Sequence, residues 1–158
     1  MSRCFAFVMA AGAVCANVAS LQANTFVVNS TADQVDANIL DGVCSTAGGT
    51  CTLRAAIQQA NALPGPHVIT LPAGVFYLTL VGPAEANAAT GDLDIKVELT
   101  IVGAGRDATV IDGLGADRVV DVASLAPPGI QVNVADMTIR NGDPGGATGG
   151  AINHPGPG

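Results

Sequence analysis

Five charged residues in the second half of the chain are of the types that could carry acid–base or metal chemistry. They are Asp92, Asp94, Asp121, Arg118 and Arg140. Aspartates on neighbouring strands could hold calcium or transfer protons, and a pair of carboxylates could hydrolyse a glycosidic bond. Nearly all the acids adjoin glycine, a strand end or an arginine, as in ordinary turns and surface ion pairs. The pattern therefore favours structural roles for these residues, and catalysis by the five is the alternative.

A second group of acids lies nearer the N-terminus. Asp33, Asp36 and Asp41 offer carboxylate oxygens, the ligands that calcium prefers, so they are candidates for a calcium site. Their spacing lacks the regular alternation of a known calcium loop, which favours solvated turn residues instead. No other cofactor is indicated.

The N-terminal segment, residues 1–23, is typical of a secretory signal peptide. Arg3 supplies a positive charge, and the apolar run over residues 4–16 is too short to span a bilayer. A buried N-terminal helix and a lipoprotein attachment site at Cys15 are the alternatives. The mature chain is expected to have no membrane-spanning segment.

Two cysteines remain after the signal peptide, Cys44 and Cys51. An even pair in an exported, oxidising setting predicts a disulfide, and the Gly-containing loop between them is flexible enough to close. Metal binding is the alternative, but two thiols without a nearby histidine supply only half a zinc site.

The composition limits the class of partner and the kind of core. The formal net charge is -7, which argues against nucleic acid, because a basic surface supplies most of the affinity for phosphates. Aromatic residues make up 3% and charged residues 12%, so the core must consist of small aliphatic side chains. Such a composition suits stacked strands. Tyr77 is the only tyrosine and tryptophan is absent, so sugar binding would rest on polar contacts.

One helix is predicted, over residues 51–61. Its apolar residues recur at helical spacing, Thr52 is placed to cap its N-terminus, and Pro64 stops it. Arg54 lies on its polar face and is expected to donate to strand-end carbonyls. A helix this short must pack against other elements to be stable, so it is predicted to cover an end of the strands that follow.

Short β-type runs recur after the helix at intervals of about twenty residues, which is typical of a solenoid. Each alternates apolar and polar residues, and no helical pattern separates the runs, so pairing between successive turns of the chain should be parallel. A β-sandwich is the alternative. The runs are 69–71, 78–80, 93–95, 99–101, 110–111, 119–122, 130–132 and 137–139.

Several motifs together resemble the exported bacterial proteins named after a Cys-Ser-Leu-Arg-Glu-Ala motif. The resemblance rests on segments 51–57, 91–95, 101–105 and 138–142 and covers nearly all of the mature chain. It implies a right-handed parallel β-helix of the pectate-lyase-like superfamily, without implying one activity. Thr52 replaces the usual Ser and Ala55 the usual Glu, so the helix keeps its cap and loses the reciprocal bond of a capping box.

The expected organisation is a signal peptide at 1–23, an N-terminal cap at 24–66 and β-helix coils at 67–158, with the last coil incomplete. The chain is expected to be an exported bacterial protein that is secreted or held at the cell surface. Its expected function is that of a non-catalytic, adhesin-like scaffold that binds polysaccharide or a cell-surface protein. The alternatives are a polysaccharide lyase or glycoside hydrolase, and a calcium-stabilised structural module.

Overall fold

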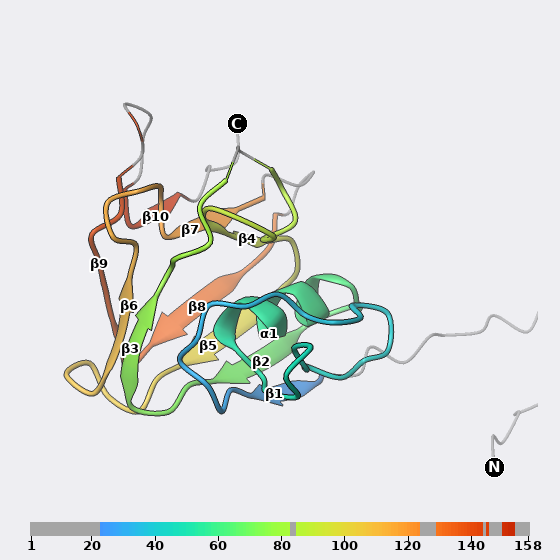
Figure 1. The fold of residues 1–158 in the computed structure, drawn as a ribbon. Coiled ribbons are helices and arrows are strands. Elements are labelled where there is room, and N and C mark those ends of the chain that lie inside the picture. The colour runs from blue at the N-terminus through green and yellow to red at the C-terminus, as the bar shows by residue number, and fades with distance from the viewer. Residues whose placement is uncertain (1–22, 83–84, 124–128, 144, 146–149, 154–158) are drawn as a thin grey trace, which may run out of the picture.

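The computed structural model describes residues 23–82, 85–123, 129–143, 145 and 150–153 (Figure 1). Residues 1–22 of the expected signal peptide lie outside this part of the chain. The fold is mostly β, with one short helix. Its elements are β1 Thr25–Val27, α1 Leu53–Asn61, β2 His67–Thr70, β3 Gly74–Tyr77, β4 Leu93–Ile95, β5 Leu99–Val102, β6 Thr109–Asp112, β7 Val120–Val122, β8 Val132–Ala135, β9 Thr138–Arg140 and β10 Ile152–Asn153.

The strands form three parallel sheets, which we name A, B and C. Sheet A has the order β1-β2-β5-β8, sheet B the order β3-β6-β9 and sheet C the order β10-β7-β4. The chain therefore visits the three sheets in the same sequence three times. Every strand pair among the described residues is parallel, which confirms the predicted pairing and does not fit an antiparallel sandwich.

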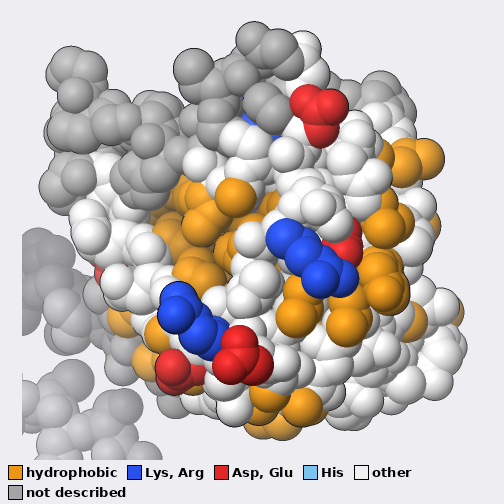
Figure 2. Space-filling view, turned by 90° about the vertical axis from the view of Figure 1, so that its left-hand side faces the viewer, with side chains coloured by type: hydrophobic (Ala, Val, Ile, Leu, Met, Phe, Trp, Pro, Cys, Tyr) orange, Lys and Arg blue, Asp and Glu red, His pale blue; other side chains and the backbone are white. Residues whose placement is uncertain are grey.

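Apolar side chains stack in register inside the three sheets. In sheet A, Phe26 pairs with Ile69, which pairs with Ile101, and all three are buried. In sheet B, Phe76 and Ile111 form an equivalent buried pair. Because side chains alternate across a strand, the residues next to these face outward. Figure 2 shows the outward face of sheet B, where charged side chains gather in two separate groups with apolar side chains beside them.

Two expected strands are shifted. The run at residues 130–132 overlaps β8 only at Val132, because β8 begins there and extends to Ala135. The run at residues 78–80 was predicted to be extended, whereas β3 ends at Tyr77. The backbone N–H groups of Thr79 and Leu80 instead donate to Oδ2 of Asp33, at 2.8 and 2.9 Å. A carboxylate far away in the sequence thus satisfies the donors that a sheet would otherwise use.

Helix α1 begins at Leu53, and Thr52 caps it as predicted. The Thr52 hydroxyl accepts from the backbone N–H of Ala55 at 3.1 Å and donates to the carbonyl of Gln34 at 2.6 Å. The helix packs against β2 and β4 (Figure 1). Its polar face is buried as well, since Arg54, Gln58 and Gln59 are all covered.

The predicted disulfide joins Cys44 to Cys51, with the two Cα atoms 5.1 Å apart. The bridge closes the loop that precedes α1 and uses both thiols, so these cysteines do not form half of a zinc site. Among the described residues, no helix has the length and apolarity needed to cross a lipid bilayer.

Candidate functional site

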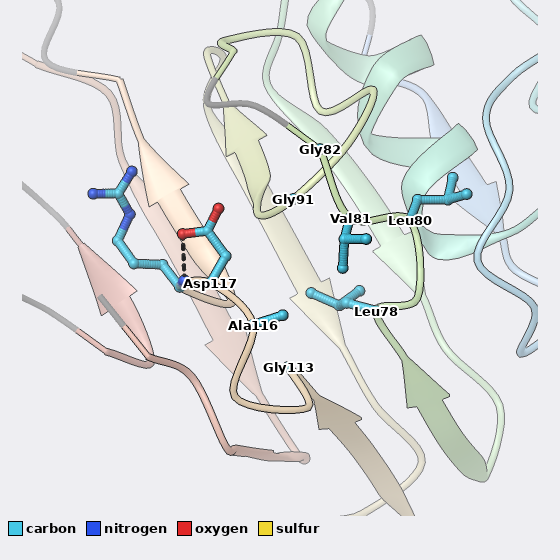
Figure 3. Close-up of a pocket in the computed structure, with 9 residues that line it drawn as sticks. Leu78, Leu80, Val81, Gly82, Gly91, Gly113, Ala116 and Asp117 are labelled. Carbon is cyan, nitrogen blue, oxygen red and sulfur yellow. Dashed lines mark hydrogen bonds between the residues drawn. The ribbon is translucent and has the colours of Figure 1, made fainter. Parts of the chain in front are cut away.

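A small hollow lies where the chain turns from sheet B into sheet C (Figure 3). Its volume is about 30 Å³, which is the space of a single water molecule. Asp117 lies on its wall and accepts a hydrogen bond through Oδ1 from the backbone N–H of Arg118 at 2.7 Å. The hollow is lined by Leu78, Leu80, Val81, Gly82, Gly91, Gly113, Ala116, Asp117 and Arg118. It has no room for a sugar ring.

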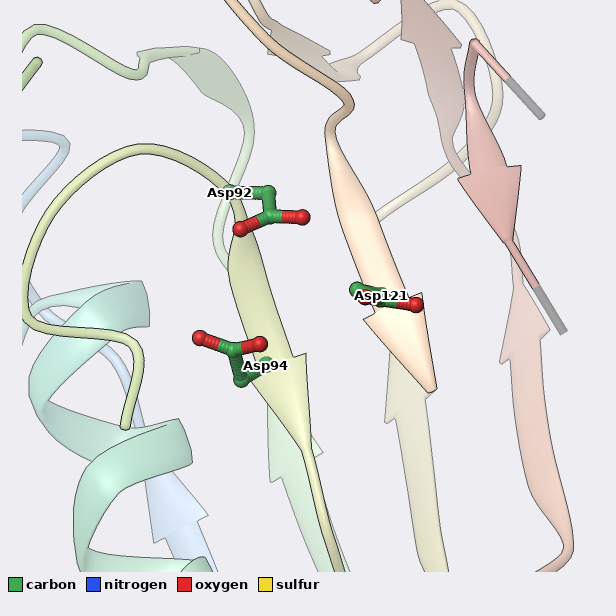
Figure 4. A group of neighbouring side chains, drawn as sticks. All are labelled: Asp92, Asp94 and Asp121. Atoms are coloured by element: carbon green, nitrogen blue, oxygen red, sulfur yellow. The ribbon is translucent and has the colours of Figure 1, made fainter. Parts of the chain in front are cut away.

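Three of the candidate acids meet on the outward face of sheet C, next to this hollow (Figure 4). Asp92 and Asp94 are two residues apart at β4, and Leu93 between them is buried in the core. Asp94 is the register partner of Asp121 on β7. Carboxylate oxygens of the three lie within 4.8 Å of one another, and no other such group occurs among the described residues. We call this group the acidic cluster.

Arg118 joins two members of the acidic cluster. Its Nε lies 3.0 Å from Oδ2 of Asp92, and its Nη2 lies 3.1 Å from Oδ2 of Asp121. The bond to Asp92 raises the pKa of Arg118. Burial raises the pKa of Asp92, although the hydrogen bond from Arg118 acts in the opposite direction. One cation therefore compensates two of the three carboxylates.

Asp94 is the member that Arg118 does not compensate. Its side chain is buried, and Oδ2 accepts a hydrogen bond from the backbone N–H of Ala88 at 2.9 Å. Burial raises its pKa to about 6, and the negative charges of Asp92, Glu85 and Asp121 act in the same direction. Asp94 thus has a raised pKa and lies in contact with the segment that carries Ala88.

Arg54 of α1 holds that segment in place. Its guanidinium donates to the carbonyls of Ala88 at 3.1 Å, Gly91 at 2.8 Å and Asp92 at 3.3 Å. It also forms an ion pair with Asp33, and both side chains are buried. Arg54 therefore donates to carbonyls at the start of a strand, as expected, and has no access to a substrate.

Arg140, the fifth candidate, lies in a different sheet. It stands on β9 of sheet B, in register with Asp112 of β6, and its Nε lies 2.8 Å from Asp112 Oδ2. Asn141 donates to Asp112 Oδ1 at 3.0 Å, and this bond is the main cause that lowers the pKa of Asp112. The five catalytic candidates therefore lie in two separate places: four in or beside the acidic cluster of sheet C, and Arg140 in sheet B. An alignment of segment 111–113 with segment 139–142, as equivalent strands of successive passes through sheet B, would have predicted the pairing of Asp112 with Arg140 from the sequence.

The calcium candidates do not come together. Asp33 binds Arg54, Thr79 and Leu80. The two other acids lie in turns and accept from nearby backbone N–H groups: Asp36 from Asn38 and Ser45, and Asp41 from Val43. Each of the three carboxylates thus has its own partners in the fold, and those of Asp33 come from distant parts of the sequence.

Comparison of the chain with protein families, with curated proteins and with solved structures finds no significant match.

Proposed function

We propose that the chain is an exported, right-handed parallel β-helix that acts as a non-catalytic binding scaffold. In this arrangement each cycle through sheets A, B and C is one coil, and α1 with the disulfide loop caps the first coil. The order of the strands and their parallel pairing support a solenoid, and the disulfide is consistent with export. Parallel connections within a sheet are right-handed in almost every known case.

The observation that carries the non-catalytic role is the pairing of arginines with acids from the adjacent coil. Arg118 binds Asp92, and Arg140 binds Asp112, in each case on the neighbouring strand. A base in polysaccharide cleavage must reach its substrate with the right protonation state. Here both guanidiniums are engaged by carboxylates, so these residues connect coils.

The outward face of sheet B is the part of the scaffold best suited to bind a polysaccharide. Tyr77, Asp112 and Arg140 are register partners in one row across the three strands. Tyr77 is 45% exposed and the side chain of Arg140 49% exposed, so an aromatic ring and a cation are presented on the same face. An aromatic ring offers an apolar face to a sugar, and the arginine offers donors to its oxygens.

The test combines a binding assay and a cleavage assay on a panel of acidic and neutral polysaccharides, each with and without calcium. We expect at least one polymer to bind and none to be cleaved. Tyr77→Ala should weaken binding about fivefold, equivalent to about 1 kcal/mol of aromatic contact. Leu40→Ala is the matched control, because Leu40 is also exposed but lies in the cap region.

Cleavage that is lost in Asp94→Asn or Arg118→Gln, with the fold intact, would replace the scaffold by a lyase or hydrolase. Binding that is equally insensitive to Tyr77→Ala and Leu40→Ala would remove sheet B as the binding face.

The acidic cluster supports a second candidate, the calcium-stabilised module. Three carboxylates with oxygens within 4.8 Å of one another match the oxygen ligands that calcium prefers. The sequence offered these three acids for either calcium binding or catalysis, and they are separate from the N-terminal calcium candidates Asp33, Asp36 and Asp41. Arg118 already supplies a positive charge there, which ranks this candidate below the scaffold.

A further inference from the structure

The backbone of β1 has an edge that is open over two residues. On the β2 side, the carbonyl of Asn24 accepts from Val68 N–H at 2.9 Å, and Val28 N–H donates to the carbonyl of Thr70 at 3.0 Å. Backbone groups alternate in direction along a strand, so those of Thr25 and Val27 point away from β2. No strand lies on that side of β1 among the described residues.

The next position on the same edge is already occupied. Asn29 N–H donates to the carbonyl of Cys51 at 3.0 Å, and Asn29 Oδ1 accepts from Cys51 N–H at 2.9 Å. The disulfide to Cys44 anchors this segment. Within the described part of the chain, the edge of β1 is therefore closed at Asn29 and open at Thr25 and Val27.

A groove of about 520 Å³ runs along the open part of the edge. Val27 and Val43 are 65% and 57% exposed, and none of the described residues that line the groove is charged. Its lining consists of Asn24, Thr25, Phe26, Val27, Asn29, Gly42, Val43, Cys44 and Cys51. We call this groove the β1 slot. A four-residue extended segment is about 13 Å long and would cover the stretch from Asn24 to Val27.

We propose that the β1 slot binds a short, uncharged, extended segment of another protein, which adds to sheet A as a strand beside β1. The N–H and C=O groups of Thr25 and Val27 supply the main-chain hydrogen bonds, as in other sheets that bind peptides at an edge. Apolar side chains at alternate positions of the segment contact Val27 and Val43. The uncharged lining selects against charged residues at those positions, since a charge there would lose water without gaining a partner. This site is separate from the outward sheet faces and does not depend on them.

The experiment selects phage-displayed random decapeptides against the full chain with its disulfide formed. Selected peptides are then synthesised and their affinities are measured for three proteins: the unsubstituted chain, Val27→Pro and Val27→Thr. Val27→Pro removes one N–H from the open edge and leaves the Asn24 and Val28 bonds to β2 in place. Val27→Thr keeps that N–H and changes only the side chain.

We expect selected peptides to have apolar residues at alternate positions and to bind Val27→Thr within about threefold of the unsubstituted chain. Val27→Pro should weaken binding at least tenfold, the scale of one or two lost main-chain hydrogen bonds. Peptides N-methylated at alternate residues should show the same loss with the unsubstituted chain. This last measurement keeps the test valid if the proline variant folds poorly.

Three outcomes would overturn the proposal. They are the absence of any selected peptide, equal binding to all three proteins, and equal losses in Val27→Thr and Val27→Pro together with full tolerance of N-methylation. Self-association of the chain that Val27→Pro abolishes would assign the β1 slot to a second copy instead.

Discussion

Asp94 and Asp121 are register partners on adjacent parallel strands, and their carboxylates lie on the same face of sheet C. Like charges placed directly opposite each other destabilise a sheet. Asp121 is partly exposed and paired with Arg118, whereas Asp94 is buried. Burial raises the pKa of Asp94 to about 6, and the charge of Asp121 acts in the same direction.

The first prediction concerns pH. The pKa of Asp94 in the folded chain, about 6, lies above its ordinary value of 3.8, so the folded state binds this proton more tightly than the unfolded state does. Stability should rise as the pH falls through 6, by about 1 kcal/mol between pH 7.5 and pH 5. Urea denaturation at the two pH values measures the change.

Asp94→Asn is the control for this prediction, because it has no proton to exchange at that position. The rise in stability toward pH 5 should be smaller in Asp94→Asn than in the unsubstituted chain by the same amount. Identical pH profiles for the two proteins would show that Asp94 does not have a raised pKa.

The second prediction compares the two arginines that connect neighbouring strands. Arg118→Gln leaves the buried carboxylate of Asp92 without its cation, and we expect a loss of about 2 kcal/mol in the free energy of unfolding. Arg140→Gln should lose about 1 kcal/mol, because Arg140 is more exposed and Asn141 still binds Asp112. Chemical denaturation at pH 7.5 ranks the variants.

Lys96→Gln is the matched control for both arginines, since the Lys96 ammonium donates an exposed hydrogen bond to the side chain of Asn87 and forms no ion pair with a described residue. It should change stability by less than about 0.5 kcal/mol. A loss for Lys96→Gln as large as for Arg118→Gln would indicate a general effect of charge and not the pairing of strands.

The third prediction concerns the buried ion pair under the cap. Arg54→Met removes the partner of Asp33 and the donors to three carbonyls, so we expect a loss of about 4 kcal/mol. Arg54→Lys should recover little, because an ammonium cannot reproduce the planar fork of donors. Thermal and urea unfolding of both variants, with the disulfide intact, measure the effect.

Gln59→Met on the same helix is the comparison. Gln59 is fully buried, and its Oε1 has no hydrogen-bond partner among the described residues. Its Nε2 donates at 3.2 Å to the carbonyl of Ile39, a residue that is 45% exposed, so replacing Gln59 should cost less than about 1 kcal/mol. Equal losses for Arg54→Met and Gln59→Met would mean that packing of α1, and not the ion pair, decides the stability of the cap.

Local patterns in the sequence predicted the helix, its Thr52 cap, the disulfide and the parallel strands, because each depends on residues close together or on a regular period. The positions of the charged groups depended on which of three sheets receives each strand. Arg118 precedes a short β-type run and Arg140 follows one, and neither pattern indicates that the first joins the acidic cluster and the second binds Asp112 in sheet B. The sequence also did not predict where β3 ends, because the backbone beyond Tyr77 is bound by Asp33, which lies 46 residues from Thr79 in the sequence.

The last prediction separates the scaffold from the calcium-stabilised module. In the unsubstituted chain Arg118 already compensates Asp92 and Asp121, so saturating calcium should raise the melting temperature by no more than about 1 °C relative to a chelator. In Arg118→Gln the three carboxylates lack that cation, and calcium should recover about 1 kcal/mol or more of the lost stability. A clear stabilisation of the unsubstituted chain by calcium would instead favour the module. If calcium does not stabilise Arg118→Gln, the acidic cluster does not bind the ion even when the arginine is removed. The physical reason would then be that the buried carboxylates do not exchange their protein contacts for calcium.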